Sequence, residues 1–146
     1  MDERLIIPLM ERCAERNSVV LFKCGFPPAQ PGPILPLAEA FPTVKFILAH
    51  TSLRIGADAA IMASRCSNLY LETSLQTLSV YKAIINSLDA SRILFGSCTP
   101  FGIAEAEIRK VAALPNITPA QREAILGGNM KRLLASGSGE RARAAP

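Results

Sequence analysis

The sequence predicts an α/β protein in which four βα units form one parallel sheet. Four short apolar runs, each bounded by glycine, proline or polar residues, alternate with segments of helical periodicity. Polar or reactive residues follow directly after these runs, at the end of a parallel sheet where ligands bind. The 146 residues suit one domain and are too few for a complete (β/α)₈ barrel of about 250 residues.

The first predicted unit is a helix followed by a strand. Apolar residues recur at helical spacing over residues 3–16, and Pro8 inside that segment predicts a kink or a late start. Residues 19–22 are apolar throughout, which predicts a strand buried on both faces. The proline-rich stretch after that strand predicts an irregular loop with a defined path.

The same alternation continues through the middle of the chain. Apolar runs predict three further strands, at residues 44–49, 69–71 and 93–95. Segments of helical periodicity predict helices at residues 34–41, 55–66, 77–88 and 103–114. Right-handed crossovers between parallel strands are then expected from chain chirality.

Capping signals predict two last helices. Thr118, Pro119 and Gln121 form a capping-box pattern that starts the first of them. Gly127 and Gly128 are expected to end it, and Asn129 is expected to cap the second. Residues 136–146 are small or charged, which predicts a disordered basic tail after a folded body of residues 1–135.

Composition excludes several function classes. The net charge of +4 is not concentrated on one segment apart from the tail, so nucleic-acid binding is not expected. The sequence has no apolar run near the roughly 18 residues of a membrane span, and its first residues lack the pattern of a signal peptide. Four separated cysteines without a CxxC pair favour free thiols and a cytoplasmic location.

Two residues at predicted strand ends carry candidate chemistry. His50, the one histidine of the sequence, is either a structural side chain or a metal ligand and acid–base group. Cys98 lies in a turn between Gly96 and Pro100. It is either a buried loop thiol, a soft metal ligand or a reactive thiolate.

Two charged residues occupy the same predicted end of the sheet. Lys23 ends the first strand and points either into the site or out to solvent. Cys24 follows it in an extended segment, so the two side chains should lie on opposite faces. Glu72 ends the third strand, where it orients His50, pairs with Lys23 or remains a solvated acid.

Taken in order, these strand ends resemble the amidohydrolase-related family, a branch of the metal-dependent amidohydrolase superfamily. The resemblance extends over residues 3–135. Four segments resemble the last four strands of the family's barrel, at residues 19–25, 41–50, 68–74 and 92–101. Residues 125–129 and the Leu133-Leu134 pair resemble the segments that follow the last strand. It implies that residues 1–135 form the carboxyl-terminal half of a (β/α)₈ TIM barrel. It also implies a small-molecule substrate.

The resemblance implies a divalent metal such as zinc and either hydrolysis of an amide, lactone or ester by metal-activated water or a non-oxidative decarboxylation. Family members hold the metal with a His-x-His pair on the first strand, histidines on the fifth and often the sixth, and a catalytic aspartate on the eighth. Only His50 matches here. Lys23 occupies the position of the fifth-strand histidine, and Cys98 occupies the position of the catalytic aspartate. Lys23 and Glu72 are then candidates for substrate binding.

These departures predict a truncated protein with a degenerate metal site. Either His50 and Cys98 are the remaining ligands of a metal, or this chain binds no metal. Hydrolase or decarboxylase activity is then weak or absent in this chain alone. The alternative is a non-catalytic assembly module, because half a barrel leaves two open strand edges and an apolar inner face. Its partner would be a second copy or a complementary amino-terminal half chain. A third hypothesis is thiol chemistry at Cys98 assisted by His50.

Overall fold

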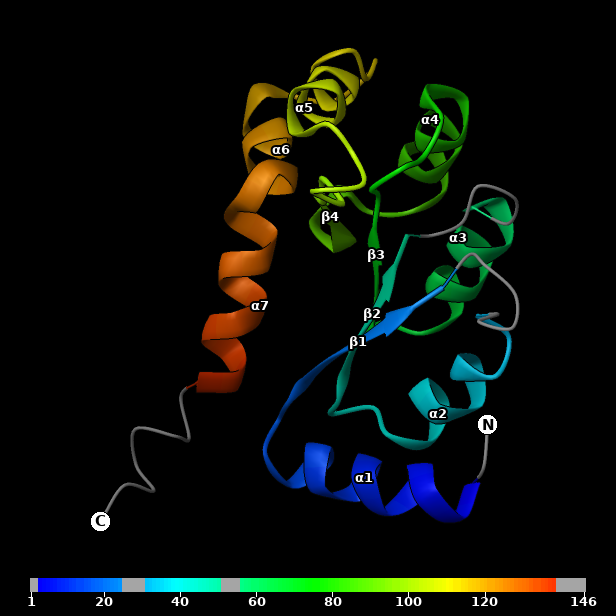
Figure 1. The fold of residues 1–146 in the computed structure, drawn as a ribbon. Coiled ribbons are helices and arrows are strands. Elements are labelled where there is room, and N and C mark those ends of the chain that lie inside the picture. Colours follow the sequence, from blue (N-terminus) through cyan, green and yellow to red (C-terminus); the bar gives the residue numbers. More distant parts are fainter. Residues whose placement is uncertain (1–2, 25–30, 51–55, 139–146) are drawn as a thin grey trace.

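A computed structural model describes residues 3–24, 31–50 and 56–138. Its four strands form one parallel sheet in the order β1-β2-β3-β4, which confirms the predicted fold class (Figure 1). Their bounds are Val19–Lys23 for β1, Lys45–Ala49 for β2, Leu69–Glu72 for β3 and Ile93–Leu94 for β4. Because the strands are parallel, their carboxyl ends lie along one edge of the sheet.

Seven α-helices lie within the described residues, close to the predicted positions. They are α1 (Glu3–Glu15), α2 (Ile34–Ala40), α3 (Gly56–Arg65), α4 (Leu78–Ser87), α5 (Ala104–Ala112), α6 (Pro119–Glu123) and α7 (Asn129–Ser138). A short 3₁₀ turn over Ala90–Arg92 precedes β4, and a π turn over Ala124–Gly128 joins α6 to α7.

Of the two alternatives predicted at Pro8, a kink or a late start of the first helix, the late start is wrong. Helix α1 begins at Glu3 and contains Pro8. A proline in this position removes one backbone hydrogen bond. Packing offsets that loss, because Met10 is fully buried and Ile6 and Ile7 contact the same core.

The main core lies between the sheet and helices α1 to α5. Alternate strand residues, among them Phe46, Leu48 and Leu71, point to this face. Tyr81 and Ile84 of α4 pack against the same core and are almost completely buried. This face is the outer face of the predicted half barrel.

The opposite, inner face of the sheet is covered in part by α7. Leu133 of α7 is buried against Ile47 and Leu94, which alternate with the residues of the main core. Figure 1 shows α7 across the sheet from α2, α3 and α4. The expectation of an open apolar inner face is therefore wrong over this region, because α7 supplies apolar side chains that exclude water from it.

Strand β1 departs from the predicted full burial. Leu21 is 57% exposed and Lys23 is exposed, although β2 beside them is almost entirely buried. The reason is position, since β1 and β4 are the outer strands of the sheet and each pairs with one neighbour. In the described part of the chain no helix is long and apolar enough to cross a membrane.

The predicted capping box at the start of α6 is present. The Gln121 side chain accepts from the Thr118 backbone at 2.8 Å, and the Thr118 hydroxyl accepts from the Gln121 backbone at 3.1 Å. Gly127 does not end the helix in a left-handed conformation. Its φ of 174° is extended, and the chain bends there and continues into α7.

Asn129 does not cap α7, which corrects a second prediction at this end of the chain. Its own backbone is helical, and its buried Nδ2 donates to the carbonyls of Ala90 and Ile93, each at 2.7 Å. Ala90 lies in the 3₁₀ turn and Ile93 begins β4, so this side chain links α7 to the start of β4 and does not cap the helix. Helix α7 continues through Ser138, so residues 136–138 of the predicted tail are helical, and residues 139–146 lie outside the described residues.

Candidate functional site

The carboxyl ends of the strands bring three of the four candidate residues to one cavity. Lys23 is the last residue of β1, His50 follows β2 and Cys98 lies in the loop after β4. Together with Leu75 and Phe101 they line a cavity of about 350 Å³. These three residues thus lie at one edge of the sheet, as the alignment of parallel strand ends predicts, and the fourth candidate, Glu72, contacts His50.

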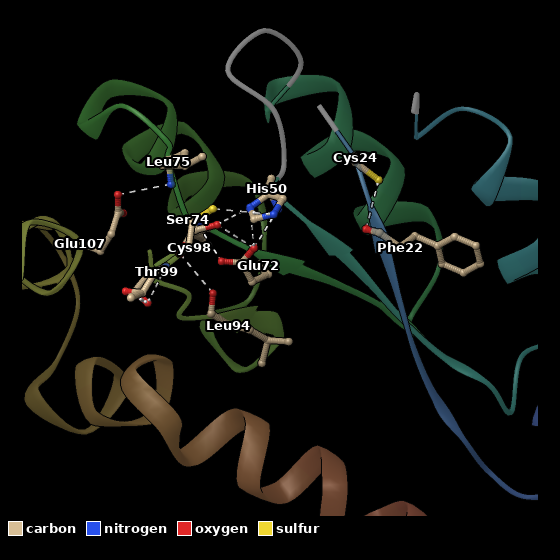
Figure 2. A network of polar contacts seen from close by, with 12 residues as sticks. Phe22, Cys24, His50, Glu72, Ser74, Leu75, Leu94, Cys98, Thr99 and Glu107 are labelled. Carbon is tan, nitrogen blue, oxygen red and sulfur yellow. Dashed lines mark hydrogen bonds and ion pairs between the residues drawn. The ribbon is translucent and has the colours of Figure 1, made fainter. Parts of the chain in front are cut away.

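Glu72 and Ser74 hold the His50 backbone and ring in place (Figure 2). The His50 backbone N–H donates to Glu72 Oε2 at 2.8 Å, and His50 Nδ1 lies 2.6 Å from Ser74 Oγ. Of the alternatives for Glu72, the structure shows the one in which it orients His50. The carboxylate is 7% exposed and also accepts from the Ser74 backbone at 2.7 Å.

The same contacts fix which nitrogen of His50 is free. Ser74 Oγ donates its proton to Glu72 Oε2 at 3.0 Å, so its oxygen accepts from His50 Nδ1–H. In neutral His50 the other nitrogen, Nε2, then carries a lone pair. Nε2 lies 4.0 Å from Cys98 Sγ, within reach of a weak hydrogen bond to sulfur.

Gly96 gives the Glu72 carboxylate its space. A Cβ added at Gly96 would lie 1.7 Å from Glu72 Oε1 and 2.4 Å from Glu72 Cδ. Any side chain at this position would displace the carboxylate that orients His50 and Ser74. Glycine is thus required at position 96, just after β4, because Glu72 at the end of the neighbouring strand β3 fills the space of a side chain.

Three residues around the cavity have left-handed backbone conformations. His50 has a φ of 53°, Leu75 of 62° and Cys98 of 52°. Non-glycine residues rarely adopt such values, and surrounding contacts must hold them there. Two backbone hydrogen bonds do so at Cys98, whose carbonyl accepts from the N–H groups of Phe101 and Gly102 at 2.8 and 2.9 Å.

Lys23 and Cys24 lie on opposite faces of the sheet, as predicted. Lys23 lines the cavity, and within the described residues no carboxylate is paired with it. Cys24 is 1% exposed, and its thiol donates to the Phe22 carbonyl (Figure 2). Burial raises the pKa of the Cys24 thiol to about 11.

This pKa shift predicts a loss of stability in alkaline solution. Unfolding returns the Cys24 thiol to its ordinary pKa of 9.0, so the unfolded chain ionises first as the pH rises. The contribution of Cys24 is complete below pH 9 and declines until pH 11. Urea unfolding across this range should show a steeper fall for the wild type than for Cys24→Ala. Equal slopes for the two proteins would contradict the assignment.

Sequence reasoning missed three residues of the site, Ser74, Leu75 and Phe101. One signal for Ser74 was present, because residues two apart in an extended segment share a face and Ser74 follows Glu72 at that spacing. Leu75 carried no such signal. Its N–H donates to the buried Glu107 of α5 at 3.3 Å, a contact that depends on the tertiary fold.

The donor set is too small for a metal centre of the expected kind. His50 and Cys98 offer one nitrogen and one sulfur to the cavity, and Lys23 adds an ammonium that has no lone pair. Among the described residues no three histidine, cysteine, aspartate or glutamate side chains group so as to hold a metal ion. A catalytic zinc takes three protein ligands and a water, so these residues alone do not fit it.

Comparisons with known proteins agree with the observed fold. The family model described as amidohydrolase matches residues 2–135. None of the curated proteins matches the chain.

Solved structures give the same fold. An uncharacterised TIM-barrel protein from Bordetella bronchiseptica is 28% identical, with a TM-score of 0.79 over 94% of this chain and 52% of its own. A dihydroxybenzoic acid decarboxylase from Polaromonas, with bound manganese and 2-nitroresorcinol, is 17% identical, with a TM-score of 0.66 over 91% of this chain and 54% of its own. The 4-oxalomesaconate hydratase of Rhodopseudomonas palustris is 14% identical, with a TM-score of 0.64 over 96% of this chain and 53% of its own. The chain thus spans about half the length of each.

Proposed function

This chain belongs to the amidohydrolase family, and from that premise we propose that it forms the carboxyl-terminal half of a barrel whose metal centre is degenerate. Metal-dependent hydrolysis or decarboxylation is then weak or absent in this chain alone. One observation carries the proposal: Lys23, His50 and Cys98 line the same cavity, and only His50 is of the type that the family resemblance implies at its position. The four free thiols support a cytoplasmic setting.

Lys23 and Cys98, at the positions of the family's histidine and aspartate, change the electrostatics of the site as well as the number of metal ligands that it offers. The ammonium of Lys23 repels a divalent cation where a neutral imidazole would bind one. A thiolate at Cys98 that bound a metal would no longer accept a proton from an attacking water. The manganese held by the Polaromonas decarboxylase supports a divalent ion as the family's cofactor, but the described donors of this chain fall short of a complete site.

Metal analysis and turnover assays test the proposal on the purified chain. The expected result is zinc or manganese well below one ion per chain, with no turnover of lactones or of aromatic carboxylates such as 2,6-dihydroxybenzoate. Stoichiometric metal together with turnover that is lost in His50→Ala would contradict it. A Lys82→Ala variant, at an exposed position on α4 outside the cavity, serves as the control for loss of activity through misfolding.

A second candidate function is assembly through the open sheet, in which four complementary strands from another chain complete the barrel. The favouring observation is the edge of β1, which among the described strands pairs with β2 alone, and where Leu21 is 57% exposed on the inner face. Exposed apolar side chains at a strand edge promote pairing with further strands. A closed eight-stranded barrel is filled by side chains, so α7 would have to leave the inner face during assembly.

Sedimentation velocity at micromolar concentration tests this candidate. The wild-type chain should associate, and Leu21→Lys should shift it toward the monomer because a charge would be buried at the new contact. Ile61→Lys is a matched control, since Ile61 is 59% exposed but lies on α3. A compact monomer at every concentration, with or without an added amino-terminal half chain, would contradict assembly.

A further inference from the structure

The thiol of Cys98 and the imidazole of His50 meet in a cavity that the proposed function leaves without chemistry. Cys98 Sγ is 4.0 Å from His50 Nε2, and both side chains line the cavity of about 350 Å³. Because the contacts of Ser74 and Glu72 leave the lone pair on Nε2, the nitrogen that faces the thiol can accept its proton. A thiol beside a base that is oriented by a third group is the arrangement of an activated nucleophile.

The other cysteines lack these features. Cys24 and Cys66 are buried, and burial raises the pKa of each thiol. Cys13 packs against the main core from α1. Cys98 is half-buried, opens into the cavity and has the imidazole beside it. The chain therefore contains its own reference thiols against which the reactivity of Cys98 can be measured.

The remaining lining indicates what the cavity would hold. The Lys23 ammonium has no carboxylate partner among the described residues, so its charge is available to an anionic group. Leu75 and Phe101 supply apolar surface. We propose that Cys98 is the nucleophile of a metal-independent acyl-transfer site for small esters or thioesters that carry a carboxylate.

The chemistry has two steps, and its atoms balance. Cys98 Sγ forms a bond to the acyl carbon while His50 Nε2 takes the thiol proton. That proton passes to the leaving alcohol or thiol as its bond to the acyl carbon breaks, and a thioester remains on Cys98. Water then attacks the thioester carbon and gives its proton to Nε2, which returns it to Sγ as the carbon–sulfur bond breaks. The products are a carboxylic acid and an alcohol or thiol.

Alkylation by iodoacetamide, mapped by peptide mass spectrometry, tests the activation of the thiol. Cys98 should react at least about tenfold faster than Cys13, since general bases accelerate proton-coupled steps by about 10²–10⁴. Cys24 and Cys66 should stay unmodified in the folded protein. His50→Ala should remove the advantage of Cys98 without changing the rate at Cys13. Equal rates at Cys98 and Cys13 in the wild type would overturn the proposal.

Mono-4-nitrophenyl succinate tests the acyl-transfer step, because it is an activated ester with a carboxylate. The expected result is a burst of about one nitrophenolate per chain and a succinyl group on Cys98. Both should be lost in Cys98→Ala and kept in Cys13→Ser. Lys23→Ala should raise KM for this ester but not for 4-nitrophenyl acetate, a readout that a general loss of folding would not produce.

A chelator separates this proposal from the metal-dependent function. The burst should be unchanged in EDTA, whereas a burst that needs added metal would overturn the thiol mechanism. A burst that persists in both Cys98→Ala and Cys98→Ser would overturn it as well. A metal-free chain with a burst that resists EDTA would support both the degenerate metal centre and the thiol mechanism. Absence of the burst would overturn the thiol mechanism and leave the degenerate metal centre unaffected.

Discussion

Replacing Gly96 with alanine should destabilise the protein by about 2–3 kcal/mol and release His50 from its present orientation. The new methyl group would lie 1.7 Å from Glu72 Oε1, which already accepts from the Ser74 N–H. Glu72 Oε2 accepts from His50 N–H and from the Ser74 hydroxyl, so the carboxylate cannot move without losing several hydrogen bonds at once. Urea unfolding measures the stability, and alkylation of Cys98 measures the loss of its base.

Gly127→Ala is the matched control for this prediction. No atom lies within 4 Å of a Cβ added at Gly127, and its φ of 174° suits any residue. We expect a change within about 0.5 kcal/mol of the wild type. If Gly96→Ala were as stable as Gly127→Ala, the Glu72 carboxylate would not hold the position described above.

Leu133→Asp should destabilise the protein by more than about 3 kcal/mol and detach α7 from the sheet. Leu133 is 4% exposed and packs on Ile47 and Leu94, so an aspartate there would bury a charge against apolar strands. Leu134→Asp, one residue further along α7, should cost far less because Leu134 is 52% exposed. Urea unfolding and limited proteolysis within α7 compare the two variants.

Equal effects of the two substitutions would show that α7 does not cover the inner face. The expected difference also bears on assembly. If α7 must leave this face before other strands can close the barrel, Leu133→Asp should associate with an amino-terminal half chain more readily than Leu134→Asp. An unchanged affinity in both variants would argue that α7 is compatible with the completed barrel.

The pattern of apolar residues predicted the elements well because each element buries its own periodic face. Residues 44–49 and 69–71 lie in central strands, where a continuous apolar run is buried on both faces as expected. The similar run at residues 19–22 lies at an edge, and no local signal distinguishes an edge strand from a central one. The role of Asn129 was misassigned for a related reason, since its carbonyl partners at Ala90 and Ile93 are 39 and 36 residues away in the chain.

The candidate site was predictable to the extent that parallel strands align their carboxyl ends. That geometry placed Lys23, His50 and Cys98 in one cavity without any knowledge of loops. It could not show that Ser74 stands between His50 and Glu72, which depends on the turn after β3. The space that Gly96 leaves for Glu72 was hidden as well, because it arises between two neighbouring strands.

Zinc binding by equilibrium dialysis tests the central claim most directly, with the wild-type chain compared with the double variant Lys23→His/Cys98→Asp. The double variant restores the ligand types that the family resemblance implies beside His50. It should bind zinc on the order of 100-fold more tightly than the wild type, because loss of even an outer-shell partner of a metal ligand lowers metal affinity by about 10–100-fold. His50→Ala added to the double variant should remove that gain. Stoichiometric, tight zinc binding by the wild-type chain, lost in His50→Ala, would contradict a degenerate metal centre.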